Sequence, residues 1–473
     1  MSNAILEAID LIANTSSKNE KQALVAKAMG DLPNFKRVCE YAYNPFKTYG
    51  IAKRPEAIVL PLGHVAYAIN MEFNEQTWDV LDDLISRRLT GEIAIDTVGI
   101  ELGRLSVQSA DLFWRIIKKD LRAGFSESTI NKASKGLIQE FPYMRCSLPK
   151  DTNLEEWPWS RGVISQEKAD GMFANLDHEE AGLDGSRVSI RSRQGTEFPM
   201  EQFANVVKEI QKRMLPGFQR HGEFVVERDG VILARAEGNG VMNHVLSGGS
   251  FAENEQPIYL VWDEIPLSSV VSKGKCSTGY VKRLASIVKQ LNAVAGESVM
   301  LIPTKVVKTL PDAYAHAADL MKLGKEGTVI KHPDAIWKDS TSKDQIKIKL
   351  EFEVDLEIIA IVEGKADGKN EGRAGSLTCK TVDGLLLVDV TVKNEDMRNR
   401  VDANHDNWIG KIIAVVANDI TLPSNSNELH SLFLPRMAEP NYRTDKHCAD
   451  SLLSVFAQKE AAIFGKSLLK EAA

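Results

Sequence analysis

A lysine, a spacer, an acid and a glycine stand together at residues 168–171 of this chain. They lie in a strand-like stretch, residues 163–176, so Lys168 is expected on a strand. A lysine amine can attack phosphorus once it has lost its proton, and neighbouring cations with partial burial favour that neutral form. The same four residue types recur at 365–368, in a glycine-rich and charged loop (364–375), to which we assign no nucleophile. The prediction therefore depends on what accompanies the first copy.

Two further lysines have the spacing expected of phosphate ligands. Lys347 and Lys349 alternate with Ile346 and Ile348, which places both amines on one face of a strand. Cations so placed can hold a phosphate and stabilise the charge that develops on it during transfer. The alternative interpretation is a solvated charge pair on an edge strand.

A bound nucleotide also needs a flat surface for its base and carboxylates for its ribose and metal. Trp262 ends an apolar strand (259–263) and is a candidate for base stacking, although it could equally be a core residue. Glu223 and Glu326 each begin an apolar strand and could supply oxygen ligands to Mg²⁺ and a ribose contact. Arg193 stands in a turn at 192–195, from which it could grip a phosphate.

The apolar periodicity predicts three successive kinds of structure that would position these residues. Residues 1–148 are expected to be mostly helical, with helices at 5–15, 21–29, 78–88 and 109–121 and another beginning at Ser126. Short strands follow at 188–193, 224–227, 258–263 and 298–302, with helices at 200–214, 278–292 and 312–323. From residue 345 almost everything is strand-like, at 346–361, 385–392 and 409–416, as in a small oligonucleotide-binding barrel, before a helical tail at 451–473.

Length, composition and charge limit the classes of protein to which the chain could belong. With 473 residues, 43% hydrophobic and 26% charged, the chain should form about three soluble domains. No run reaches the roughly 18 apolar residues of a membrane helix, and no basic signal-peptide region opens the chain, so neither a membrane nor secretion is expected. Five scattered cysteines indicate a reducing cytoplasm rather than disulfides or zinc. The net charge is −7, yet residues 104–150 carry nine Lys or Arg against four Asp or Glu, which indicates a local basic face.

Six motifs occur in a fixed order, at 168–171, 192–195, 222–223, 261–263, 326–331 and 347–349. This series resembles the covalent nucleotidyltransferases. The chain as a whole resembles the ATP-dependent DNA ligases of T-even bacteriophages, with further likeness at 87–91, 118–124, 432–435 and 443–446.

The resemblance implies an α+β protein of three domains: a helical DNA-binding domain (1–148), an adenylation or nucleotidyltransferase domain with antiparallel sheets (149–350) and an oligonucleotide-binding (OB) barrel with a helical tail (351–473). Lys168 would take AMP from ATP, pass it to the 5′-phosphate of a nick in duplex DNA, and leave the 3′-hydroxyl to displace it. Arg443 and Lys446 would orient the pyrophosphate, after which the barrel swings away to close around DNA.

The resemblance also implies a role for each site residue. The nucleotide would be held by Glu167, Lys168, Arg193, Glu223, Trp262, Lys347, Lys349, Arg443 and Lys446, and Mg²⁺ by Glu223 and Glu326. DNA phosphates would meet Arg87, Arg88, Thr90, Gly91, Lys118, Lys119, Arg122 and Lys132, contacts that fix position without reading sequence. We expect a monomer, located in the cytoplasm, or in that of the host cell if the protein is viral.

Two departures from the family pattern stand out. Phe173 occupies the place, two residues after the motif glycine, where an arginine is usual, so Arg191 or Arg193 is expected to supply the missing contact. Residues 436–440 are also more irregular than the usual basic run before Arg443.

Four alternatives share part of the pattern. An RNA-joining ligase or an mRNA-capping enzyme would carry the lysine motif but usually lacks such a helical domain in front. An NAD-dependent ligase would need a cysteine quartet that is absent. A nick-binding protein that has lost catalysis is supported only by Phe173.

Overall fold

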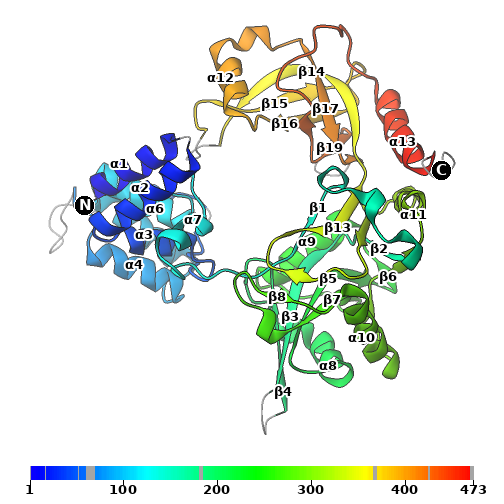
Figure 1. Cartoon of the computed structure of the whole chain (residues 1–473). Coiled ribbons are helices and arrows are strands. Elements are labelled where there is room, and N and C mark those ends of the chain that lie inside the picture. The colour runs from blue at the N-terminus through cyan, green and yellow to red at the C-terminus, as the bar shows by residue number, and fades with distance from the viewer. Residues whose placement is uncertain are drawn as a thin grey trace. The chain divides into compact units, whose positions relative to one another are not determined.

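The structure, a computed structural model, describes residues 2–15, 17–51, 53–59, 70–180, 185–365, 370–423 and 427–468. Two compact units divide it: residues 1–141 with 194–196, and residues 142–193 with 197–473. The chain mixes α and β structure, as predicted (Figure 1).

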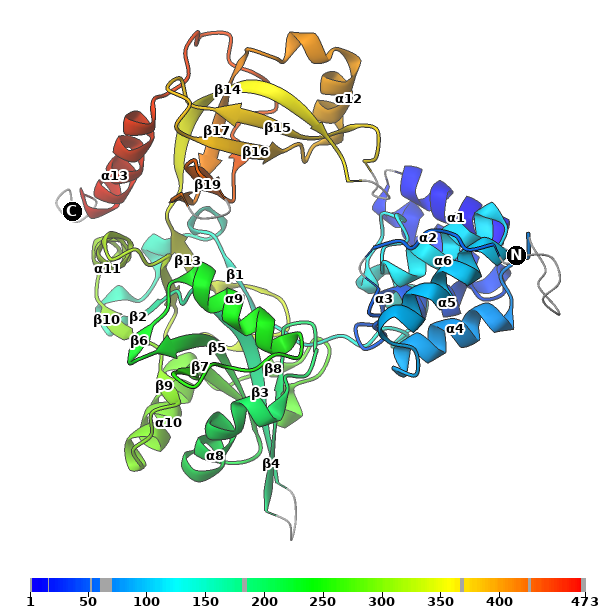
Figure 2. The same ribbon diagram turned by 180° about the vertical axis from the view of Figure 1, so that it is seen from behind.

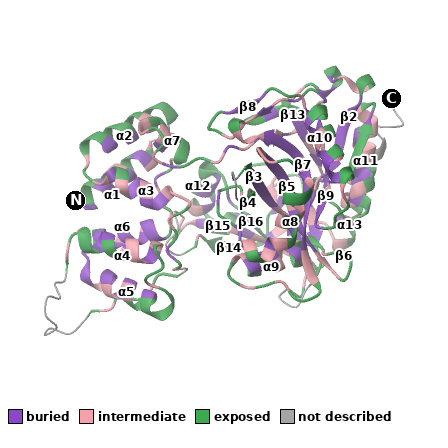
Figure 3. Ribbon diagram, turned by 90° about the horizontal axis from the view of Figure 1, so that it is seen from below, coloured by how far each residue is buried: buried purple, intermediate pink, exposed green. Residues whose placement is uncertain are grey.

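The first unit is built from helices packed about one core. Ile9, Phe35, Trp78 and Phe113 lie buried at its centre, and Figure 3 shows their helices turning buried faces inward and exposed faces outward. Asn74 begins α4 with a capping box, its side chain accepting the Thr77 N–H. The helices are α1 (Ser2–Asn14), α2 (Lys18–Asp31), α3 (Phe35–Tyr43), α4 (Glu75–Ile85), α5 (Gly91–Arg104), α6 (Val107–Ile117) and α7 (Glu127–Ala133).

The second unit contains two sheets that carry the motif residues. The first sheet runs β1 (Arg145–Ser147), β13 (Thr341–Lys349), β11 (Gly327–Lys331), β2 (Val163–Glu167) and β10 (Thr304–Val307). Helix α11 (Leu310–Lys322) packs on it through buried alanines such as Ala313 and Ala317. Only the β1–β13 pairing is parallel among these strands.

The second sheet is longer-stranded and carries its own helices. Its order is β4 (Ser186–Arg191), β3 (Met172–Glu180), β5 (Phe218–Arg228), β7 (Glu255–Pro266) and β9 (Val299–Leu301), with β6 (Val231–Ile232) paired to β5. The helices around it are α8 (Ala204–Arg213), α9 (Arg235–Leu246) and α10 (Tyr280–Ala293), of which α9 is prominent from behind (Figure 2). The two-residue strands β8 (Lys275–Cys276) and β12 (Trp337–Lys338) pair separately.

A curled antiparallel sheet forms the rest of the second unit (Figure 1). Register shifts between Ile358 and Ala360 and between Val362 and Glu363 bend its longest strand. Its order is β16 (Leu387–Thr391), β15 (Ala374–Lys380), β14 (Phe352–Glu363), β17 (Ile412–Ala417) and β20 (Arg436–Met437). Beside it lie the hairpin β18 (Asp419–Thr421) and β19 (Ser431–Phe433), helix α12 (Glu395–Ala403) and the C-terminal helix α13 (Leu452–Leu468), which packs on α11.

The structure corrects the sequence-based elements in three places. Residues 163–176 are not one strand, because β2 and β3 belong to different sheets and the chain leaves regular structure between them. Residues 346–361 likewise divide into β13 and β14, and Asn418 holds the break by donating to the Leu350 carbonyl at 2.7 Å. The region after residue 345 is not all strand, since Asn394 caps α12.

Candidate active site

The two sheets of the second unit enclose a cavity of about 510 Å³. Its lining comes from β2, β11 and β13 of the first sheet and from β3, β5 and β7 of the second. Seven of the predicted nucleotide ligands lie in this lining: Glu167, Lys168, Arg193, Glu223, Trp262, Lys347 and Lys349.

Lys168 is not on a strand but in the connection from β2 to β3. Its backbone N–H donates to the Gly327 carbonyl at 2.9 Å, which ties it to the first sheet. Its Nζ lies 2.5 Å from Oε2 of Glu326, and both side chains are largely buried. The geometry holds the amine at the cavity wall and gives it a carboxylate partner close enough to exchange a proton.

Two more charged residues complete this cluster. Arg235, the first residue of α9, places Nη1 2.6 Å from Oδ1 of Asp170 and 3.9 Å from Oε2 of Glu326. Burial raises the pKa of Asp170 to about 6, opposed by Arg235 and assisted by the nearby Glu326 carboxylate. The Lys168 amine, one further cation and two carboxylates thus form this cluster.

Glu223 connects the same loop to the second sheet. Its Oε1 accepts the Gly171 N–H at 3.2 Å. A Cβ at Gly171 would stand 2.1 Å from the Phe224 carbonyl oxygen, so only glycine fits this close approach. Burial raises the pKa of Glu223 to about 7, against the opposing effect of Lys168.

The opposite wall is aromatic and buried. Trp262 is half-buried and lines the cavity, as base stacking requires. The Tyr280 hydroxyl lies 2.7 Å from the Trp262 carbonyl oxygen and 2.9 Å from Oε1 of Gln166, two acceptors for its one proton. Lys331 donates to the Tyr280 hydroxyl at 3.2 Å, and its burial lowers its pKa to about 8.

Phe173, which replaces an expected arginine, supports one instead. The Arg193 guanidinium lies 5.1 Å from the Phe173 ring centroid and 4.6 Å from that of Tyr143. Arg191 is engaged away from the cavity, with Asp177 at 2.8 Å and Glu197 at 3.2 Å. Of the two arginines expected to compensate for Phe173, the structure brings Arg193 to the cavity.

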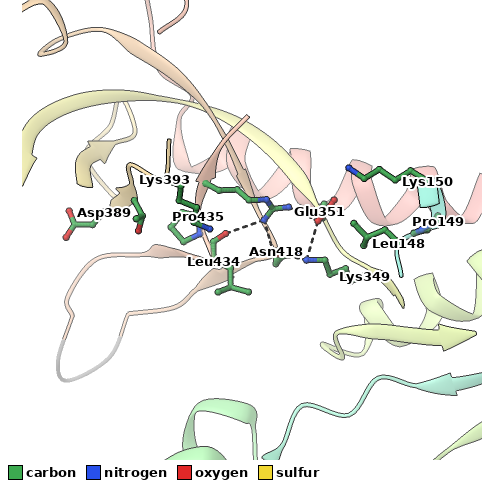
Figure 4. A pocket seen from close by; sticks show the side chains of 12 residues that line it. Leu148, Pro149, Lys150, Lys349, Glu351, Asp389, Lys393, Asn418, Leu434 and Pro435 are labelled. Carbon is green, nitrogen blue, oxygen red and sulfur yellow. Dashed lines mark hydrogen bonds and ion pairs between the residues drawn. The ribbon is translucent and has the colours of Figure 1, made fainter. Parts of the chain in front are cut away.

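Lys347 and Lys349 are half-buried and both line the cavity, which favours a ligand role over a solvated pair. Lys349 also reaches a second hollow, shown in Figure 4. There its Nζ lies 3.3 Å from Glu351 and 3.5 Å from Asn418, and Glu351 also pairs with Arg436 at 2.6 Å.

Arg443 and Lys446 are not in the cavity lining. Arg443 pairs with Asp445 at 2.6 Å and with Asp355 at 3.2 Å, and Lys446 pairs with Asp355 at 2.9 Å. The remaining predicted ligand, Glu167, pairs with Lys325 at 3.2 Å.

The predicted DNA-binding residues of the first unit differ in how far their side chains are exposed. Lys119 points inward, donating to the carbonyls of Asn44 and Lys47, and burial lowers its pKa to about 8. Arg122 is half-buried, and Arg88 pairs with Asp83. Exposed members of the set are Arg87, Arg88, Thr90, Gly91, Lys118 and Lys132.

The second copy of the lysine motif lies largely outside the described residues, which omit 366–369. Within the described ranges, no group of three or more His, Cys, Asp or Glu side chains could hold a metal ion. Glu223 and Glu326, on either side of Lys168, are a donor set that suits Mg²⁺, which needs one or two carboxylates when phosphate oxygens and water complete its shell. No helix among the described residues is long and apolar enough to cross a membrane.

Sequence reasoning gave no role to Arg235, Tyr280 or Lys331, although Lys331 ends one of the motifs. Lys331 and Tyr280 are buried, and Lys331 donates to the Tyr280 hydroxyl. Arg235 is the first residue of α9, a position that brings its guanidinium beside Asp170. No local sequence signal marks Arg235.

In this fold, the loop that carries Lys168 lies between two sheets, and a curled antiparallel sheet follows them along the chain. No family model matches the chain. It is 26% identical to the DNA ligase of Enterobacteria phage T4 over 494 aligned residues, covering 96% of this chain and 98% of that protein, and equally to the DNA ligase of Enterobacteria phage T6. The predicted resemblance is thereby confirmed.

Two solved structures share the fold along most of the chain. The one named "Pmar-Lig_Pre." has a TM-score of 0.73 and 19% identity, covering 93% of this chain and 99% of its own. The one named "Pmar-Lig_PreS3" has a TM-score of 0.71 and 20% identity with the same coverage.

Proposed function

We propose that this chain is an ATP-dependent DNA ligase that seals nicks between a 5′-phosphate and a 3′-hydroxyl in duplex DNA. The observation that carries the proposal is Lys168, held 2.5 Å from Glu326 in a cavity that also presents Lys347, Lys349 and the Trp262 ring. Similarity to phage DNA ligases along 96% of the chain supports the same reaction.

In the first step the Lys168 amine attacks the α-phosphorus of ATP. A nitrogen–phosphorus bond forms as the bond to pyrophosphate breaks, and the lysine proton leaves, for which Glu326 is the nearest acceptor. Lys347 and Lys349 hold the α-phosphate, Trp262 stacks on adenine, and Glu223 contacts the ribose. Mg²⁺, held by Glu223 and Glu326, would neutralise phosphate charge when bound.

AMP then moves from Lys168 to the 5′-phosphate at the nick, and the 3′-hydroxyl displaces it to join the strand. Each step is an in-line displacement at phosphorus, so positioning and charge neutralisation supply most of the rate enhancement. Arg443 and Lys446 lie outside the cavity lining. In the proposal they orient the leaving pyrophosphate, and the barrel then swings away to close around DNA.

Three parts divide this work in the proposal. Residues 1–148 form the helical DNA-binding domain, residues 149–350 the adenylation domain and residues 351–473 the OB barrel with its tail. The exposed residues Arg87, Arg88, Lys118 and Lys132 contact phosphates of the nicked duplex. A single chain contains every predicted ligand, so the enzyme acts as a monomer.

Incubation with α-labelled ATP and Mg²⁺, followed by denaturation, tests the first step. Label should remain on the wild-type protein and be absent from Lys168→Ala. Wild-type protein that stays unlabelled even after pyrophosphate treatment to remove prebound AMP would refute the enzyme and favour a nick-binding protein. Sealing of a DNA nick but not of an all-RNA nick by labelled protein then distinguishes a DNA ligase from an RNA-joining one.

A further inference from the structure

Arg235 is the only charged residue of the cluster around Lys168 that belongs to no motif. It opens α9, and its guanidinium is 2.6 Å from Asp170 of the nucleophile loop and 3.9 Å from Glu326. Its side chain is 39% exposed, and neither Arg235 nor Asp170 belongs to the cavity lining. It is therefore open to a partner on its other side.

That partner comes from the β18–β19 hairpin beside the curled sheet. The Arg235 guanidinium carbon stands 4.3 Å from the centroid of the Phe433 ring, within the range of a cation–π contact. Phe433 ends β19, where it pairs with Asp419, and the next residue, Leu434, lines the cavity itself. One arginine thus links the nucleophile loop to the barrel segment beside it.

The chemistry explains why this link matters. While Lys168 is charged, it balances Glu326 and Arg235 balances Asp170. An attacking lysine is neutral, and once its proton has passed to Glu326, Arg235 is the cation of this cluster that remains beside Asp170 and Glu326. Without Arg235, the two acidic side chains would have no cation to hold them in place around Lys168.

We propose that Arg235 is a positioning residue that holds Asp170 and Glu326 in place around Lys168, and that Phe433 of the barrel in turn positions Arg235. Formation of the lysine–AMP bond then depends on a barrel residue that never touches ATP. The inference rests on the proposed ligase function and names a further residue pair that serves its first step.

The test measures single-turnover formation of labelled lysyl-AMP at a series of ATP concentrations. Arg235→Gln should lower the maximal rate about 100-fold with little change in the ATP concentration at half-maximal rate, as expected for lost electrostatic positioning. Arg235→Lys, which keeps the charge, should restore the rate to within about tenfold of wild type. Phe433→Leu should slow the reaction about fivefold, the effect of losing one cation–π contact.

The decisive comparison is Phe433→Leu in the Arg235→Gln background, where no further slowing is expected because the contact is already gone. Arg228→Gln is the matched control, since Arg228 also pairs with a residue of α9, Glu237, but not with the cavity. Its rate should equal that of wild type.

Three results would overturn the inference: a fivefold effect of Phe433→Leu that persists without Arg235, an Arg235→Lys rate as low as that of Arg235→Gln, or normal rates in every variant. Should Arg235→Gln fail to fold, Arg235→Met, which also removes the charge, replaces it in the same comparison. Wild-type protein that forms no lysyl-AMP would instead refute the proposed function, so the two failures are distinguishable.

Discussion

The cavity of the second unit and the cationic residues of the first unit use charge in opposite ways. Lys168, Glu326, Arg235 and Asp170 are linked by successive ion pairs of 2.5, 3.9 and 2.6 Å, partly out of water. On the first unit, Arg87, Lys118 and Lys132 are exposed. Charges that face one another at low dielectric interact strongly. Exposed charges are screened by water and salt, so their effect on binding depends on how many of them act together. Single substitutions should therefore be decisive in the cavity and weak on the first unit.

The largest effect is expected from Lys168→Arg. A guanidinium keeps the positive charge beside Glu326 but cannot lose its proton to attack phosphorus, so lysyl-AMP formation should fall about 10⁴-fold or more. Labelling with α-labelled ATP measures it, and Lys365→Arg, at the exposed lysine that begins the second copy of the motif, is the matched control. Equal loss in both variants would mean that the cavity does not single out Lys168.

On the first unit, we expect a large loss of DNA binding only when several exposed cations are replaced together. Replacing Arg87, Arg88, Lys118 and Lys132 together by Ala should weaken binding to a nicked duplex about 100-fold and lower the magnitude of the salt slope by about 3 to 4. Lysyl-AMP formation should stay at the wild-type rate.

The control for that variant changes four other exposed lysines of the same unit, Lys18, Lys27, Lys36 and Lys53, to Ala. It loses the same charge but none of the predicted contacts. An equal decrease in affinity would show that net charge, and not these particular positions, holds the DNA.

Lys119 tests whether all the first unit's cations behave alike. Its ammonium donates to two backbone carbonyls, so Lys119→Met should remove both bonds, leave the Asn44 carbonyl only its bond from the Lys47 N–H, and lower the free energy of unfolding by about 2 kcal/mol. Lys118→Met, at the exposed neighbour, should change it by less than about 0.5 kcal/mol. Denaturant titration measures both, and the reverse order would place Lys119 on the binding surface.

The smallest expected effect is on the pH dependence of the free energy of unfolding. Burial lowers the pKa of His221, in the cavity lining, from 6.5 to about 4. The unfolded chain therefore binds more protons between these values, so stability falls as pH drops through this window. Relative to His221→Gln, wild type should lose about 1.4 kcal/mol of unfolding free energy between pH 7.5 and pH 5.5.

His178 provides the internal reference for this measurement. Burial, with Arg220 nearby, lowers its pKa to about 4 as well, and it is present in both proteins. Its contribution cancels in the difference. A pH dependence that is identical in wild type and His221→Gln would mean that His221 is accessible to protons in the folded state.

Sequence patterns predicted the cavity better than the elements around it. Lys168, Glu223, Trp262 and Lys347 meet at one cavity because each motif carries residue types that only make chemical sense together. Period-two alternation, by contrast, continues unbroken from Ile346 to Leu356, where the chain passes from one sheet to another. The break at 350–351 was invisible for that reason.

Tertiary partners account for the remaining differences. Arg235 becomes part of the site only because α9 begins beside Asp170, and Lys119 turns inward only because the carbonyls of Asn44 and Lys47 are there to accept it. Neighbouring lysines such as Lys118 and Lys119 look alike in the sequence. Which of them is exposed depends on contacts with residues some 70 positions away.

The nucleophile loop, the four residues from Lys168 to Gly171, is hydrogen-bonded to a different sheet at each of its two ends. Lys168 is hydrogen-bonded to the first sheet through Gly327, and Gly171 to the second through Glu223. Any rotation of one sheet against the other must therefore be absorbed by the backbone torsions of Ala169 and Asp170. Such a rotation would change the separation of Trp262 from Lys347, while the bond to Gly327 kept Lys168 with the first sheet. The width of the cavity and the position of its amine can then vary independently.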